Sequence, residues 1–156
     1  MVITYKDMKE RKSDLDSHFR KRINFLSESM SSLLSAYINS IGLSEQETFN
    51  YQNRDRRCVV ALDPQDDKLV FKGTNTIDSN PTTFFIATIL DASQKNIIYA
   101  GCNVSLKTDY DADALLVTIG DYPSQKEFEV DGGDFSDVCE AIQKLTYQNI
   151  DKFKKA

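Results

Sequence analysis

The sequence has little of what catalytic sites are usually built from. It contains one histidine, three cysteines and six glycines among 156 residues. Cys58, Cys102 and Cys139 are odd in number, far apart and set in apolar surroundings, which fits neither a disulfide framework nor a zinc site. The glycines are scattered, so no phosphate-binding loop is predicted. We therefore expect a cytoplasmic protein in a reducing compartment, without a bound cofactor.

Long apolar runs are also missing. The longest, Phe84 to Leu90, is far shorter than the ~20 residues that a membrane-spanning helix needs. The first twelve residues lack the apolar centre of a signal peptide. With 40% apolar and 28% charged residues, the composition is that of a soluble globular protein. We expect no membrane association, and a single α+β domain over residues 1–156.

The acidic net charge of −5 is unevenly spread along the chain. Residues 1–57 hold ten basic and eight acidic side chains, whereas the remainder holds nine and sixteen. A slightly basic first third on an acidic body favours attraction of a charged partner. A nucleic-acid-binding domain is normally more basic than this, so nucleic acid is not the expected partner.

A long helix is predicted from about Ser13 to Ile41. Ser13 with Asp16 resembles a capping box, and Gly42 is a typical C-terminal stop. The same pattern reaches back weakly through Tyr5, Met8 and Lys12. Apolar residues recur at helical spacing through the segment, at Leu15, Phe19, Ile23, Leu26, Met30, Leu33, Tyr37 and Ile41.

The predicted helix is long for its domain. Its apolar stripe spans about 40 Å, close to the expected diameter of a compact chain of this size, so the helix crosses the domain or overhangs it. Phe25, Leu34 and Ile38 lie outside the narrow stripe and widen the apolar surface. A surface wider than one sheet can cover is often closed by a second subunit, so we expect a homodimer.

The single histidine, His18, lies at the edge of this stripe. Asp14 precedes it by one helical turn, and Lys21 and Arg22 follow it by one turn. No second histidine is present to share a metal, and no nucleophile is held against it by the helix. We interpret His18 as a boundary residue of the helix and not as a catalytic group.

After Gly42 the apolar period changes to two, which predicts strands. Their connections, such as N-R-D-R at 53–56, are too short for crossover helices, so an antiparallel meander of six to seven strands is expected. Strand 83–90 is apolar on both faces and should be central, and Gly101 indicates a bulge or a close backbone approach. The predicted strands cover residues 48–53, 57–62, 68–72, 83–90, 96–106, 115–119 and 126–130.

A second helix, capped by Asp134 or Ser136, is predicted to pack on the sheet through an apolar face. The fold class is therefore α+β: a long N-terminal helix, an antiparallel meander and a C-terminal helix. The expected buried face of the second helix contains Val138, Cys139, Ile142, Leu145, Asn149, Ile150 and Phe153.

Two groups of acids have part of the pattern of a metal site. Asp109, Asp111 and Asp113 resemble the start of a calcium loop, but its glycine and closing glutamate are missing. Asp55 followed by the acids and lysine of residues 66–68 has the order of a metal-dependent nuclease site, yet the second group falls in a turn. We assign no catalytic, metal or cofactor residues.

Basic residues form two groups, Arg54 to Arg57 and Arg20 to Arg22. If they met in space, they would form an anion-binding patch, although separate solvated side chains are the simpler expectation. Arg20 and Arg22, together with the apolar residues Phe25, Leu34 and Ile38, are the predicted interaction residues.

Three functions follow from these observations. We expect a non-enzymatic protein–protein interaction module of adaptor, inhibitor, immunity or chaperone type, dimeric and acting through the long helix. The first alternative is small-molecule binding in an apolar pocket between sheet and helix, lined by residues such as Phe85, Tyr99 and Tyr110. The second is an acid- or metal-dependent enzyme whose carboxylates come from distant loops.

Overall fold

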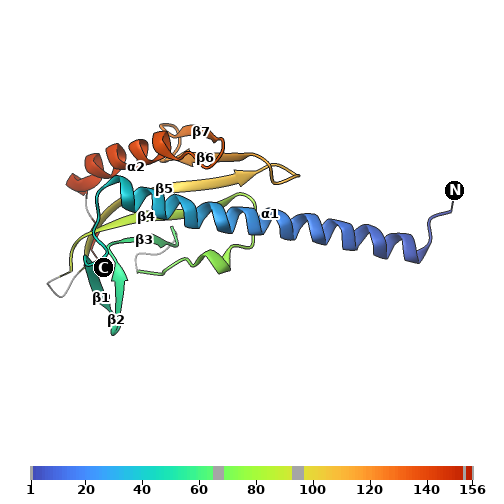
Figure 1. Ribbon diagram of the computed structural model, residues 1–156, viewed down its shortest axis with the longest axis horizontal. Coiled ribbons are helices and arrows are strands. Elements are labelled where there is room, and N and C mark those ends of the chain that lie inside the picture. Colours follow the sequence, from blue (N-terminus) through green and yellow to red (C-terminus); the bar gives the residue numbers. More distant parts are fainter. Residues whose placement is uncertain (1, 65–68, 93–96, 153, 156) are drawn as a thin grey trace.

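The computed structural model describes residues 2–64, 69–92, 97–152 and 154–155. It shows an α+β fold in which one long helix lies across a sheet and extends well past it (Figure 1). The helices are α1 (Tyr5–Ser40), η1 (Thr74–Thr76), α2 (Ser136–Gln148) and η2 (Asn149–Lys152). The strands are β1 (Thr48–Tyr51), β2 (Arg54–Arg57), β3 (Val59–Leu62), β4 (Thr82–Asp91), β5 (Ile98–Thr108), β6 (Leu115–Ile119), β7 (Lys126–Val130) and β8 (Lys154–Lys155).

The helix α1 begins earlier than the sequence predicted. Its N-cap is Thr4, which forms a complete capping box with Asp7. The predicted cap at Ser13 is wrong: Ser13 and Asp16 lie inside the helix, and the carboxylate of Asp16 accepts a hydrogen bond from Lys12. The weak pattern before Ser13 therefore belongs to the helix itself.

The main sheet is the predicted antiparallel meander. Its order is β3-β4-β5-β6-β7, and β8 pairs with the start of β5. Both helices cover the same face, since one core cluster joins Leu33 of α1, Val104 of β5 and Ile142 of α2. The C-terminal helix packs on the sheet as expected, but the predicted cap at Asp134 or Ser136 is wrong: the N-cap is Phe135, whose side chain caps no amide. The carboxylate of Asp134, one residue earlier, accepts hydrogen bonds from the Ser136 amide and hydroxyl.

The opposite face of the sheet carries a second, smaller core cluster. It joins Phe49 of β1 to Ala87 of β4 and Tyr99 of β5. Since β4 also contributes Phe84 and Ile86 to the first cluster, its predicted burial on both faces is confirmed.

A separate hairpin of β1 and β2 lies on this second face and forms its own two-stranded sheet. The prediction of a turn at N-R-D-R is wrong by about two residues. The turn is at Gln52 and Asn53, which take positive φ angles of 51° and 63°, and Arg54 already starts β2. Asparagine tolerates this conformation better than most residues, and the pair fits the tight hairpin that the strand twist favours.

The strand predicted at 68–72 is reduced to a bridge. Phe71 pairs with Leu62, the amide of Lys72 donates to the carbonyl of Ala61, and Asp63 donates to Val70. Residue 68 of that prediction lies outside the described residues. The segment covers the apolar residues of the second cluster without forming a regular strand.

Candidate functional site

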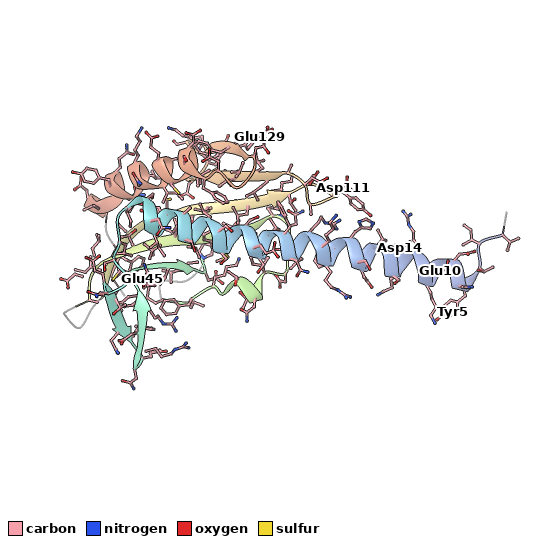
Figure 2. The ribbon with its side chains drawn as sticks, in the orientation of Figure 1. Tyr5, Glu10, Asp14, Glu45, Asp111 and Glu129 are labelled. Carbon is pink, nitrogen blue, oxygen red and sulfur yellow. The ribbon has the colours of Figure 1, made fainter. Side chains whose placement is uncertain are left out.

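The first half of α1 projects beyond the rest of the molecule (Figure 1). Every residue from 2 to 17 is exposed. With 36 residues, α1 is about 54 Å long at ~1.5 Å per residue, whereas a compact body of this size measures roughly 40 Å across. Figure 2 shows Tyr5, Glu10 and Asp14 on this projecting stretch, beyond the sheet. We call residues 5–19 the arm.

Local interactions hold the arm in its helical form. At its tip, the amide of Thr4 donates to the Asp7 carboxylate at 2.8 Å, and the amide of Asp7 donates to the Thr4 hydroxyl at 3.2 Å. These hydrogen bonds lower the pKa of Asp7. Two exposed ion pairs one turn apart, Lys6 with Glu10 and Lys12 with Asp16, add a few tenths of a kcal/mol each.

The apolar stripe of α1 continues from the body onto the arm without changing direction. At about 100° per residue, Met8 points the same way as the buried Leu26, and Leu15 and Phe19 lie within about 20° of it. Leu26 is 0% exposed, whereas Met8, Leu15 and Phe19 are 60%, 45% and 44% exposed. The same face is thus core in one half of the helix and bare surface in the other.

The boundary between arm and body is a contact with the loop from β5 to β6. The ring of Tyr110 stacks on His18 with centroids 4.7 Å apart, and the guanidinium of Arg22 lies 4.9 Å from the centre of the same ring. Arg22 also donates to the carbonyl of Tyr110 at 3.4 Å. His18 is therefore a boundary residue that packs on a loop.

The predicted interaction residues fall on the body rather than on the arm. Phe25, Leu34 and Ile38 are partly buried and pack against the main core cluster. Arg20 is exposed and, with Phe25, lines a groove of about 460 Å³ beside α1, whereas Arg22 is held on Tyr110. The structure therefore brings Arg20 and Phe25 together and places Leu34 and Ile38 farther along the helix.

The exposed apolar residues of the arm were not singled out from the sequence. Leu15 and Phe19 have the same spacing as the buried residues that follow them, so periodicity alone does not separate the two groups. The available signal was length, because a helix longer than its body must leave one end uncovered. The arm stripe consists of Tyr5, Met8, Leu15 and Phe19.

The acidic loop at the base of the arm has a structural role for one of its acids. The carboxylate of Asp109 accepts hydrogen bonds from the amides of Asp113 at 2.8 Å and Ala114 at 3.2 Å, which lower its pKa. Carboxylate oxygens of Asp109, Asp111 and Asp113 come within 4.8 Å of one another, and all three residues are exposed. This concentrates negative charge beside α1, where Figure 2 shows Asp111.

The two basic groups do not meet. Arg54 to Arg57 form β2, near the C-terminal end of α1, and Arg20 to Arg22 lie near the middle of the helix (Figure 1). The guanidinium of Arg56 packs over the ring of Phe71 at 3.8 Å. Asp55 accepts a hydrogen bond from Asn50, and the acids and lysine of residues 66–68 lie outside the described residues.

The three aromatic residues proposed for a ligand pocket are also not gathered. Tyr110 lies at the base of the arm, and Tyr99 packs edge-on against Phe85 with centroids 6.1 Å apart. Only Phe85 of the three lines the pocket of about 430 Å³ between β5, the end of β6 and α2. Its walls mix apolar and polar side chains, including Asn103 and Asp121.

No protein-family model, curated protein or solved structure matches this chain. Among the described residues, no helix combines the length and apolarity that crossing a membrane requires. The most unusual feature of the chain's own geometry is the arm.

Proposed function

We propose that the chain is a non-enzymatic protein–protein interaction module whose binding element is the arm. One observation carries the proposal: the stripe that forms the core at Leu26 and Leu33 runs on, in the same direction, over apolar residues that are exposed in the described structure. Burial of apolar surface is the main favourable term in association, so an uncovered continuation of a core stripe favours a protein partner.

The arm is also preorganised as a helix before it binds. Its capping box and ion pairs order the helix before a partner arrives, which lowers the entropy lost on association. An amphipathic helix presenting residues at this spacing is a recurrent recognition element in protein complexes. Three free thiols suit action in the reducing cytoplasm.

Affinity capture from the native cell with matched variants tests this proposal. Met8→Glu with Phe19→Glu places two charges on the arm stripe. Ser13→Glu with Ser17→Glu places the same charge on the opposite face of the same exposed helix. We expect the first pair to abolish binding of a stoichiometric partner, or of a second copy, and the second pair to retain it. Equal behaviour of the two variants would contradict the proposal.

A further inference from the structure

We infer that the arm binds the arm of a second copy of this chain, antiparallel, with Met8 of each subunit opposite the partner's Phe19. This inference rests on the proposed function of the arm and identifies the partner that the arm binds. It follows from three features of the structure: the position of the body relative to the stripe, the length of the arm, and the positions of its charged side chains.

The position of the body excludes a parallel pair of arms. A partner helix must lie on the stripe side of α1 to cover Met8, Leu15 and Phe19. From Leu26 onward, that same side is filled by the subunit's own sheet, which packs on Leu26 and Leu33. A parallel partner helix would continue straight into this sheet. An antiparallel partner ends its helix before the sheet, and its own body lies beyond the tip of the first arm.

The length of the arm restricts the register. We call the line along which the two apolar stripes pack the seam. Two antiparallel helices can shift along it only by whole heptads, since the apolar residues of one must stay opposite those of the other. In the longest register that the body allows, Tyr5 lies opposite the partner's Arg22, at the edge of the sheet. A further heptad would place Tyr5 against the partner's Ser29, which is already buried in its own subunit. The allowed overlap, residues 5–22, is about 27 Å long.

Charge distinguishes this register from the one in which the two arms overlap by one heptad less, which we call the shorter register. In the shorter register, Lys9 faces the partner's Lys9 and Arg11 faces the partner's Arg11, so like charges meet on both sides of the seam. In the longer register, Lys9 faces the partner's Asp16, and the twofold axis repeats this favourable pair. Opposite charges therefore meet where Met8 covers the partner's Phe19.

The other side of the seam uses the acidic loop. There, Arg11 approaches the partner's His18, against which the partner's Tyr110 is stacked. The carboxylates of Asp109, Asp111 and Asp113 lie on this loop. A basic side chain thus reaches a region of concentrated negative charge, which an unpaired arm leaves facing solvent.

A charged residue in the middle of the seam limits affinity. Lys12 lies opposite the partner's Leu15, and its ammonium must remain at the edge of the interface while its methylenes cover the leucine. A polar residue at a seam position specifies register at a cost in stability. We therefore expect a reversible dimer with a dissociation constant on the order of micromolar.

A charge-swap cycle tests orientation and register. Lys9→Glu places a negative charge opposite the partner's Asp16, and Asp16→Lys places a positive charge opposite the partner's Lys9. Each change should raise the dissociation constant by about 5- to 10-fold, and the double variant should recover most of that loss. In a parallel pair, Lys9 and Asp16 do not meet, so no recovery would occur. Lys6→Glu is the matched control on the opposite face and should leave the dissociation constant nearly unchanged.

Cysteine cross-linking gives an independent readout. With Met8→Cys and Phe19→Cys in one chain, mild oxidation should link residue 8 to the partner's residue 19 and give a covalent dimer. Met8→Cys alone should give none, because its two copies lie about 16 Å apart along the seam. A parallel arrangement would link the single variant. The unmodified chain controls for the half-buried Cys58.

The molecular mass in solution, measured over protein concentrations of about 1 to 200 µM, distinguishes failure of the second-copy inference from failure of the proposed function. A monomer throughout that range, with a partner captured only by an intact arm stripe, would overturn the second-copy inference and leave the proposed function standing. A monomer with no arm-dependent partner would overturn both. A dimer unaffected by the Met8→Glu, Phe19→Glu variant would overturn the second-copy inference, since its interface would lie elsewhere; the proposed function would then stand or fall with arm-dependent capture of another partner.

Discussion

The rings of His18 and Tyr110 are stacked with their centroids 4.7 Å apart, joining the middle of α1 to the loop between β5 and β6. This contact marks the point where the body stops supporting the helix. We expect Tyr110→Ala to lower the free energy of unfolding by about 1 kcal/mol, since the stacking and the contact with Arg22 are lost together. Backbone amides around residues 18–22 should then exchange faster with deuterium.

The control for that change is Tyr122→Ala, because Tyr122 is 87% exposed. It should leave both the free energy of unfolding and the exchange of these amides unchanged. Equal effects of the two substitutions would show that the loop does not anchor α1.

The two halves of the stripe should respond differently to the same truncation. Leu33→Ala removes a fully buried side chain from the main core and should lower the free energy of unfolding by about 3 kcal/mol. Leu15→Ala, in the same stripe, should cost less than about 1 kcal/mol in dilute monomer, since its side chain is already half exposed. Urea unfolding of both variants at low protein concentration measures the difference.

Gly101 should tolerate no side chain. A β-carbon there would collide with the backbone carbonyl of Ile86 and lie 2.9 Å from the Phe85 ring. We expect Gly101→Ala to cost about 3 kcal/mol or more, because strands β4 and β5 must separate to make room. Gly42→Ala, where nothing lies within 4 Å of the new carbon, should cost only about 1 kcal/mol through its φ of +67°. Comparable thermal midpoints for the two variants would contradict this account.

Cys102 should make stability depend on pH in the alkaline range. Burial raises the pKa of its thiol to about 12, from an ordinary value of 9.0. Below pH 9 the thiol is protonated in both states; above it, only the unfolded chain loses the proton, so its contribution to stability falls as pH rises. The slope approaches about 1.4 kcal/mol per pH unit between those limits.

This dependence is measured as a difference between the unmodified chain and Cys102→Ala. Tyrosine and lysine ionisation is common to both proteins and cancels. The difference in the free energy of unfolding should be constant from pH 7 to 8.5 and shrink above pH 9. A difference that stays constant to pH 11 would show that the thiol ionises with its ordinary pKa.

Periodicity and turn chemistry were enough to predict most of the fold. The boundaries of β6 and β7 match the expected strands 115–119 and 126–130, because both are short, alternating and closed by polar turns. The alternation of Phe84 with Phe85 likewise indicated that β4 is covered on both sides. Local sequence was less informative where two conformations compete, as at Gln52 and Asn53, which form the turn immediately before the charged run that suggested a loop.

For the candidate site, the sequence predicted the type of surface but not the residues that form it. The sequence indicated more apolar helix surface than one body can cover, but it placed the excess at Phe25, Leu34 and Ile38, which the core partly absorbs. The uncovered residues are instead those of the arm. Which part of a uniform stripe remains exposed depends on where the sheet ends, and the contact of His18 with Tyr110, a residue distant in sequence, lies at that point.

The capping box of Thr4 and Asp7 has a consequence for how the chain responds to its surroundings. Because the tip is held by local bonds rather than by packing, warming should unwind it gradually from the free end while the sheet is still intact. Pairing of two copies would oppose that unwinding. The length of the arm that remains helical would then depend on the concentration of the protein as well as on temperature.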